Sequence, residues 1–440
     1  MFLHLFFILL YFLFSLFSSD VSLSILLSVH AASMIIDRHL IRKLPIDPLF
    51  CYGIYSIFVG IANIVMIFNV AIGDVPLGYS YILPENIVDS IGIFFVGNAF
   101  IYMGYELFAK NSFYSVAIYI RDRKNHEVLF WVMLALSVRT LFFNEVVFGS
   151  LTTILTVFSS VGIVFFARLW GKFDNKTYKR YALILFVLQT IYALMSSYLR
   201  MSLLMPTLSI ALGYFLGKGS MKTVLSYRLI PVLVLLYFFN ASFSFLGENR
   251  QEFGEVGGME RIERMITASK VERIYEENEK RESVIYRASV LPQITNVVEL
   301  VKNRGHFNGD ASAPLLIALI PRFLWPDKPL IGLGAWFATE IGQGLQTDSW
   351  YTNSINMTIQ GHLYLDFSWI GLALGCMFVG GFLVSLWNST DFYKSSYNIS
   401  GITLGGYLML SALQGIGADL QIVITYLSYY FIFLFLKKVT

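Results

Sequence analysis

The chain has 440 residues, of which 56% are hydrophobic and only 14% charged, and its formal net charge is +3 at pH 7. Soluble domains carry about 25% charged residues, so this composition excludes an ordinary soluble protein and indicates that lipid surrounds much of the chain. Cys51 and Cys376, the only two cysteines, both lie in apolar stretches, so we expect no disulfide framework.

Twelve apolar stretches are long enough to cross about 30 Å of hydrocarbon. The first lacks both a basic segment before it and a small-residue cleavage site, so it predicts a retained helix and not a signal peptide. The pattern therefore predicts an all-α polytopic membrane protein. The predicted transmembrane helices are residues 2–18, 21–36, 49–72, 87–109, 128–144, 149–168, 181–198, 201–217, 229–246, 368–387, 400–416 and 420–436.

The distribution of Lys and Arg predicts the orientation, because cytoplasmic loops of membrane proteins carry an excess of both. With both termini in the cytoplasm, the short inside loops and the tail hold eighteen Lys and Arg residues. The short outside loops hold one, Arg200. Residues 247–354 must then lie wholly on the external side, which would be the periplasm if the membrane is a bacterial inner membrane.

This external part has two sections, which gives the chain four predicted domains. Its beginning is highly charged, with acid-first i,i+4 pairs such as Glu260 and Arg264, and predicts a helical loop followed by an irregular stretch from Gly305 to Ala311. The apolar piece from Pro314 to Trp325 is too short to span and is interrupted by prolines, so it predicts a re-entrant or interfacial segment. The predicted domains are 1–246 (N-terminal transmembrane bundle), 247–312 (external charged helical loop), 313–354 (re-entrant segment) and 355–440 (C-terminal transmembrane helices).

Four basic residues at the external face are candidates for chemistry, whereas no signature of a soluble enzyme and no metal-ligand spacing occurs. Arg200 opens a span, and Arg287 lies where the charged loop turns apolar. Arg322 lies inside the short apolar piece, with Lys328 six residues later. Ionisable residues at membrane depth usually face an internal cavity, and guanidinium groups match phosphate oxygens. We therefore expect an anionic, lipid-attached ligand; the alternative is a structural, paired or snorkelling cation.

The run from Ile320 to Pro329, IPRFLWPDKP, resembles the signature of Wzy-type O-antigen and oligosaccharide repeat-unit polymerases. Downstream, the run GHLYLDF falls where this family commonly has a Gly-Glu-x-Tyr-x-Asn-Phe sequence, with His362 in place of the Glu and Asp366 in place of the Asn. Upstream, Arg200 and Arg287 match arginines that recur in the family.

The resemblance implies a glycosyltransferase that polymerises polyprenyl-diphosphate-linked oligosaccharides into a surface polysaccharide at the outer face of the cytoplasmic membrane. We expect Arg200, Arg287 and Arg322 to stabilise the leaving diphosphate, Lys328 to steer it, and neither a metal ion nor a cofactor to take part. The candidate base is His362, because histidine exchanges protons near neutral pH. Asp366, one helical turn later, would orient it or be the base itself; the alternative for His362 is a buried structural histidine.

Two other functions stay open. One is an O-antigen ligase-like transferase that uses the same donor with a different acceptor, and the other is a glycolipid flippase or transporter. Transporters usually show internal repeats and short loops, which this sequence does not. The expected partners are the lipid-linked oligosaccharide as donor and acceptor, the bilayer, a chain-length-regulating co-polymerase and a flippase, with no nucleic acid.

Overall fold

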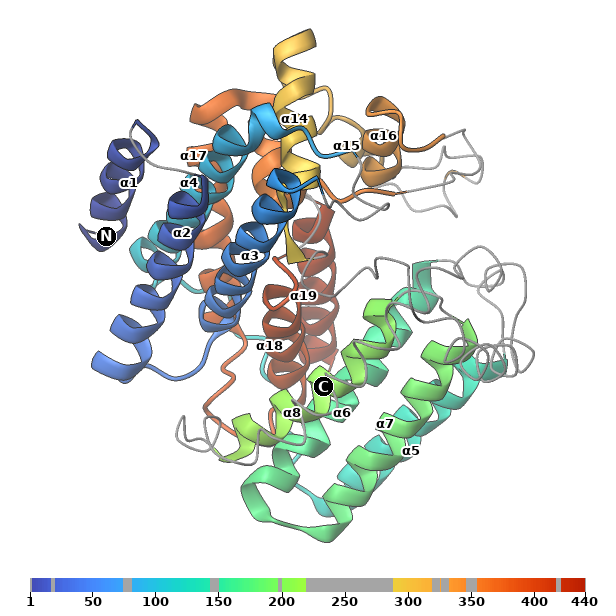
Figure 1. Cartoon of the computed structure of the whole chain (residues 1–440). Coiled ribbons are helices and arrows are strands. Elements are labelled where there is room, and N and C mark those ends of the chain that lie inside the picture. The colour runs from blue at the N-terminus through green and yellow to red at the C-terminus, as the bar shows by residue number, and fades with distance from the viewer. Residues whose placement is uncertain are drawn as a thin grey trace, which may run out of the picture. The chain divides into compact units, whose positions relative to one another are not determined.

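In the residues that it describes, the computed structural model contains helices joined by loops and no strand (Figure 1). The described residues are 2–16, 20–73, 81–142, 150–196, 200–218, 288–318, 325, 332–345, 354–416 and 421–439. The chain forms two compact units. The first comprises Met1–Tyr114, Ile285–Asn388 and Ser411–Phe435, and the second comprises Ser115–Val284, Ser389–Leu410 and Leu436–Thr440.

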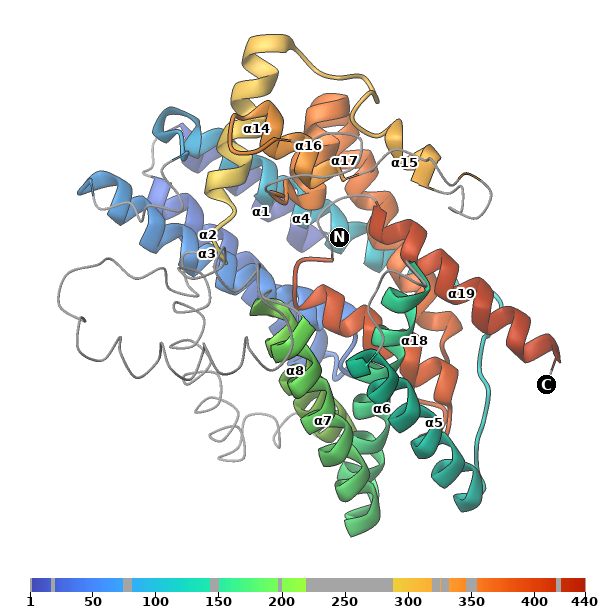
Figure 2. The same ribbon diagram turned by 90° about the vertical axis from the view of Figure 1, so that its right-hand side faces the viewer.

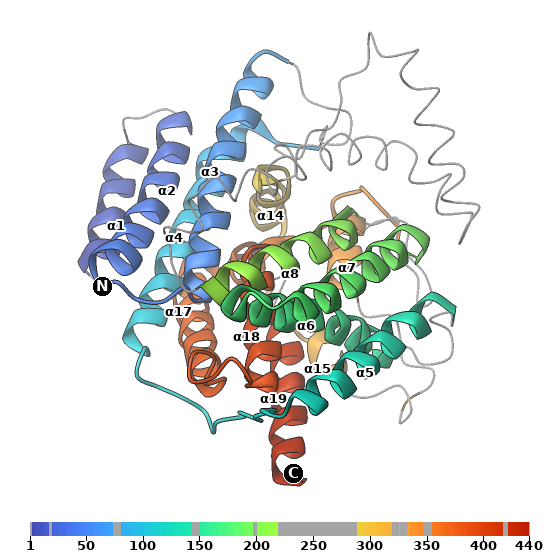
Figure 3. The same ribbon diagram turned by 90° about the horizontal axis from the view of Figure 1, so that it is seen from below.

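Four N-terminal helices pack side by side in the first unit (Figure 3), where α2 contacts α1, α3 and α4, and α1 contacts α4. The start of α3 follows from its sequence. The Asp47 side chain accepts a hydrogen bond from the Phe50 amide at 2.9 Å, and Pro48 occupies the first helical position, which needs no amide donor. The helices are α1 (Phe2–Ser15), α2 (Asp20–Ile35) with the π-helical turn η1 (Ile36–Ile41), α3 (Pro48–Ala71), and α4 (Ile87–Leu107) after the 3-10 turn η3 (Pro84–Asn86).

Four helices of the described part are long and apolar enough to cross a membrane. This agrees with the predicted all-α membrane protein. Every predicted span on described residues overlaps a helix, but the span at 229–246 lies outside them, so the count of twelve stays a prediction. The four are α2 with η1 (Asp20–Ile41), α3 (Pro48–Ala71), η3 with α4 (Pro84–Leu107) and α17 (Thr358–Ser389).

A buried polar network joins α3, α4 and α17 inside the first unit. Tyr52 donates a hydrogen bond to Asn98 Oδ1, and Gln360 Nε2 donates to the Tyr52 hydroxyl at 2.5 Å and to Asn98 Oδ1 at 2.8 Å. On its other side, Asn98 Nδ2 donates to Ser56 Oγ at 3.3 Å, and Tyr102 donates to the same oxygen at 3.0 Å. Polar groups within a membrane need such partners because lipid offers none. The network therefore fixes how the three helices are rotated against one another.

The second unit is built around α6, which packs on α5, α7 and α8 (Figure 1). The helices α6 and α8 approach closely, because a Cβ atom on Gly217 would lie 2.3 Å from the Arg168 carbonyl oxygen and one on Gly171 would lie 2.3 Å from that of Tyr214. Small residues permit such crossings between membrane helices. The elements are α5 (Arg123–Phe142), α6 (Ser150–Phe173), α7 (Lys176–Ser196), α8 (Arg200–Lys218) and α18 (Ile399–Ala412) up to Leu410.

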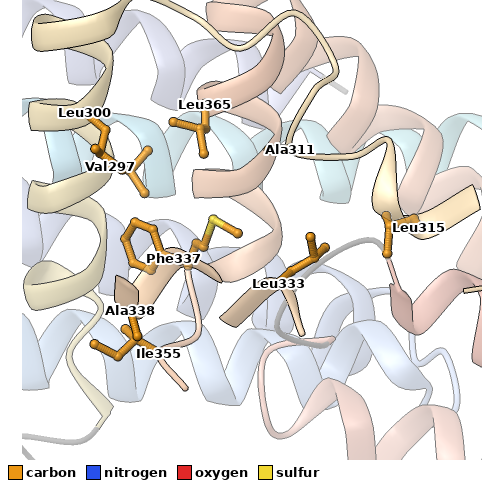
Figure 4. Close-up of a cluster of buried hydrophobic side chains, with 10 residues drawn as sticks. Val297, Leu300, Ala311, Leu315, Leu333, Phe337, Ala338, Ile355 and Leu365 are labelled. Carbon is orange, nitrogen blue, oxygen red and sulfur yellow. The ribbon is translucent and has the colours of Figure 1, made fainter. Parts of the chain in front are cut away.

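The region that precedes α17 has a hydrophobic cluster of its own within the first unit. Figure 2 shows the helix α14 close to α16 and α17, and α14 also contacts η3 and α4. In Figure 4, Val297 and Leu300 from α14, Phe337 from α16 and Leu365 from α17 belong to one buried group, with Leu315 and Leu333. The predicted external loop therefore contains a helix whose apolar side is buried. The bounds are α14 (Leu291–Arg304), α15 (Pro314–Ala318) and α16 (Leu333–Glu340); α19 (Gln421–Val439) is the last helix.

Candidate functional site

The helix α17 is interrupted, and the candidate site lies at the interruption. Phe367 (φ −130°, ψ 15°) and Ser368 (φ 61°, ψ −164°) have non-helical backbone angles. A break of this kind leaves the last carbonyl groups of the first half-helix without their usual donors. The loop after α14 supplies these donors to three backbone carbonyl oxygens. His306 Nδ1 donates to that of Tyr364 at 3.0 Å. The amides of Phe307 and Asn308 donate to those of Leu365, at 3.0 Å, and Asp366, at 2.8 Å.

The side chain of Asp366 holds the same loop through three further hydrogen bonds. Its Oδ1 atom accepts from the amides of Gly309, at 3.3 Å, and Ala311, at 3.1 Å, while Oδ2 accepts from the hydroxyl of Ser312. Positive φ angles at Asn308 (53°) and Gly309 (102°) turn the loop so that these amides converge on one carboxylate. The residues from 306 to 312 are therefore fastened to the end of the half-helix.

His362 meets the same hydroxyl one turn earlier on α17. The Ser312 Oγ atom lies 3.0 Å from His362 Nε2, and Asp366 Oδ2 lies 3.5 Å from the same nitrogen. Ser312 has one hydroxyl proton, which it donates in the hydrogen bond to Asp366. We infer that His362 donates from Nε2, which leaves the lone pair of the imidazole on Nδ1.

The imidazole therefore has an orienting carboxylate beside Nε2 and an unpaired lone pair on Nδ1. His362 Nδ1 has no hydrogen-bond partner among the described residues. In nucleophile–histidine–acid sites, likewise, an acid on one ring nitrogen fixes the tautomer that leaves the other nitrogen basic. The His362 and Asp366 side chains are 0% exposed, whereas Ser312 is partly exposed. The cluster thus reaches the surface through Ser312.

The predicted contact between His362 and Asp366 is therefore present, although their catalytic roles stay predictions. The four predicted cations lack a described geometry. Arg200 begins α8 in the second unit, but its side chain is outside what the structure describes. Arg287, Arg322 and Lys328 lie outside the described residues altogether.

Ser312 was not predicted from the sequence. The two glycines before it, Gly305 and Gly309, were the available sequence signal for a turn. They have positive φ angles of 77° and 102°, which glycine adopts readily. Glycines at this spacing predict a folded turn but do not say which distant side chain the turn meets. That distant partner, Asp366, is 54 residues away from Ser312.

The cluster also lies next to the signature segment along the chain. The loop that Asp366 holds leads directly into α15, and the segment between α15 and α16 contains Ile320 to Pro329. Leu315 before this segment and Leu333 after it are both buried in the cluster of Figure 4. Described residues on either side of the signature segment therefore belong to the same hydrophobic cluster as Leu365, the neighbour of Asp366 on α17.

Within the described residues, no group of three or more His, Cys, Asp or Glu side chains could hold a metal ion. Comparison with known proteins found that no protein-family model, no curated protein and no solved structure matches this chain.

Proposed function

We propose that this chain is a membrane glycosyltransferase that polymerises polyprenyl-diphosphate-linked oligosaccharide repeat units into a surface polysaccharide. The observation that carries the proposal is the resemblance of Ile320 to Pro329, followed by the Gly361 to Phe367 run, to Wzy-type repeat-unit polymerases. The geometry supports it, because His362 and Asp366 of that run meet at one hydroxyl, that of Ser312, shortly before the signature segment in the chain.

The proposed setting is the bacterial cytoplasmic membrane, with about twelve spans, cytoplasmic termini and an external face that carries the reaction. The four apolar helices support a membrane protein and the asymmetry of Lys and Arg supports the orientation, whereas the bacterial cytoplasmic membrane is proposed from the resemblance alone. The reaction would then use substrates that have already been moved to the outer leaflet. A flippase and a co-polymerase that sets the chain length are the partners proposed with it.

In the proposed reaction, a sugar hydroxyl of one repeat unit attacks the anomeric carbon of the growing chain. The new carbon–oxygen bond forms as the bond from that carbon to the phosphate oxygen breaks, and polyprenyl diphosphate leaves with the electron pair. We assign stabilisation of the developing negative charge to Arg200, Arg287 and Arg322, and an outer steering role to Lys328. Fixed cations in a water-poor site can provide this stabilisation without a metal ion.

The proton of the attacking hydroxyl goes to His362 in this scheme. Nδ1 is the nitrogen with the lone pair, and Asp366 together with Ser312 keeps the other nitrogen protonated. Because His362 is 0% exposed and its Nδ1 atom is itself buried, the acceptor sugar reaches the base only when the surrounding residues move. We assign this movement to the loop from 306 to 312, which Asp366 holds and which carries the partly exposed Ser312.

The decisive experiment incubates the purified full chain in sealed proteoliposomes with a synthetic polyprenyl-diphosphate repeat unit and separates the products by gel electrophoresis. We expect a ladder of increasing repeat number, and we expect it to persist in excess EDTA. A matched reaction with the Arg322→Lys variant controls for contaminating enzymes. A single transfer to another acceptor would favour the ligase, and unchanged substrate that crosses the bilayer would favour the flippase; either result contradicts the polymerase.

A further inference from the structure

A row of basic and aromatic side chains lies at one end of α6, α7 and α8 in the second unit. The Lys179 ammonium lies 5.5 Å from the centre of the Trp170 ring, and the Trp170 and Tyr214 ring centres are 4.6 Å apart. The Lys218 ammonium lies 5.6 Å from the centre of the Tyr214 ring. We call Lys179, Trp170, Tyr214 and Lys218 the basic–aromatic row. It places one ammonium group beyond each side of an aromatic pair.

Two features of the chain bring these residues together. Only residues 174 and 175 separate α6 from α7, so Trp170 near the end of α6 and Lys179 near the start of α7 lie at the same end of the unit. The close crossing at Gly171 and Gly217 then brings the end of α8 against the end of α6. The row is thus a product of helix packing and not of flexible surface side chains alone.

The charge around the row is strongly positive. Residues 168–180 and 218 include six basic residues and one acid, Asp174. In the described part of the chain, none of these basic side chains forms an ion pair. Arg168 is 4% exposed, donates from Nη2 to the Phe392 carbonyl oxygen at 3.0 Å, and has no partner for Nη1 among the described residues. This end of the unit therefore carries positive charge that its own side chains do not neutralise.

The chemistry of the row fits a phosphate group at the surface of a membrane. Trp and Tyr are enriched at the depth of lipid headgroups, where the ring is apolar on one side and hydrated on the other. Lysine stems lie along apolar surface while the ammonium reaches water or phosphate, and basic clusters at the ends of membrane helices attract anionic lipids. A soluble anion would use the charges but would gain nothing from the aromatic pair.

We propose that the basic–aromatic row binds the phosphate headgroup of an anionic phospholipid, with Lys179 and Lys218 contacting the phosphate from either side of the Trp170–Tyr214 pair. Lys172, which is exposed and one helical turn after Arg168, adds a third charge at the same end of α6. The bound lipid would neutralise part of the excess charge and hold the ends of α6 and α8 together. This site is independent of the polymerase activity.

The test measures lipid retention by native mass spectrometry of the full chain, titrated with phosphatidylglycerol or with phosphatidylcholine. The variant combines Lys172→Gln, Lys179→Gln and Lys218→Gln. Each lysine near a membrane surface contributes about 1 kcal/mol to binding of anionic lipid, which is roughly fivefold. We therefore expect the triple variant to bind phosphatidylglycerol roughly a hundredfold more weakly, with retention of phosphatidylcholine unchanged.

A matched control combines Lys43→Gln, Lys110→Gln and Lys438→Gln, three exposed lysines outside the row. It removes the same formal charge and is expected to keep nearly all phosphatidylglycerol binding. An equal loss in both triple variants would overturn the site in favour of nonspecific attraction. Retention of phosphatidylcholine as strong as that of phosphatidylglycerol, or full displacement of the lipid by inorganic phosphate, would also overturn it, the latter in favour of a soluble anion.

Discussion

The hydroxyl of Ser312 donates a hydrogen bond to the carboxylate of Asp366, and its oxygen lies 3.0 Å from His362 Nε2. One side chain on a loop thus connects two side chains on the first half of a broken helix. Because the loop leads into the signature segment, a change at any of the three residues should affect both the stability of the loop and the orientation of the imidazole.

Asp366→Asn should destabilise the protein. The amide that replaces Oδ2 or Oδ1 would face either the hydroxyl of Ser312 or two backbone amides, so at least one buried donor loses its acceptor. A buried unsatisfied polar group costs about 1–3 kcal/mol. Thermal unfolding of the detergent-purified variant checks this expectation. Asp310→Asn is the control, because Asp310 is exposed on the same loop, and it should unfold like the wild type; equal unfolding of both variants would contradict the role of Asp366.

Ser312→Ala should lower polymer formation more than it lowers folded yield. Without the hydroxyl, His362 Nε2 loses its hydrogen bond at 3.0 Å and keeps only the Asp366 oxygen at 3.5 Å, so the tautomer with the lone pair on Nδ1 is held less firmly. Ser312→Thr keeps the hydroxyl, so it should restore most of the activity, whereas a purely steric role would make threonine the more harmful change. Quantified ladders from equal amounts of folded protein decide between the two outcomes.

The sequence predicted the helices better than it predicted the site, for a physical reason. The predicted span at 368–387 begins at the break in α17 and covers its second half, whereas the first half, which begins at Thr358, was not predicted. The turns of α17 that the predicted span left out contain Gln360, His362 and Asp366. These polar side chains argue against a transmembrane helix unless their hydrogen-bond partners are known. Their partners are Tyr52, Asn98 and Ser312, which are distant in sequence, so hydropathy could not reveal that these polar groups are satisfied.

The break at Phe367 and Ser368 was equally hidden, because neither residue is a proline or a glycine. Its stability comes from the donors of the loop at 306–308, which replace the lost helical bonds. The proximity of His362 and Asp366, by contrast, follows from an i,i+4 spacing on a helix and was predictable. The contact between neighbours on one helix could therefore be predicted from the sequence, whereas the hydrogen bonds from residues distant in sequence could not.

The orientation can be tested by single cysteines at exposed or partly exposed positions. A cysteine at Asn308, in the loop before the signature segment, should react with a membrane-impermeant maleimide in intact cells. A cysteine at Asn175, between α6 and α7, should react only after permeabilisation. The native Cys51 and Cys376 are buried and should give little background. Protection of the Asn308 position in intact cells, with labelling after permeabilisation, would reverse the proposed topology.

Arg322→Lys should abolish most polymer formation with the protein still inserted in the membrane. Lysine keeps the charge but loses the planar pair of donors that matches phosphate oxygens. Arg304→Lys is the control, because Arg304 is exposed, pairs with Glu340 and is not one of the arginines assigned to the diphosphate. Surface-polysaccharide ladders from cells that express equal amounts of each variant provide the measurement. Near-normal ladders from Arg322→Lys would make this arginine a structural residue.

His362 is the position at which the chain differs most from the family that it resembles, and its substitutions separate catalysis from packing. A general base typically contributes 10²–10⁴-fold to the rate, so His362→Ala should lose activity by about that factor and should not lose it completely. His362→Glu should keep measurable activity, because a carboxylate can accept the proton and the family commonly has Glu here.

A structural role predicts a different pattern for the same two variants. His362 is fully buried against Ser312 and Asp366, so a glutamate would bring a second carboxylate next to the first and damage folding at least as much as alanine does. Activity should therefore be divided by the amount of folded, monodisperse protein. A glutamate variant that is more active per folded molecule than the alanine variant supports the base. An alanine variant as active per molecule as the wild type removes His362 from the chemistry, and Asp366 then becomes the remaining acid–base group of the cluster.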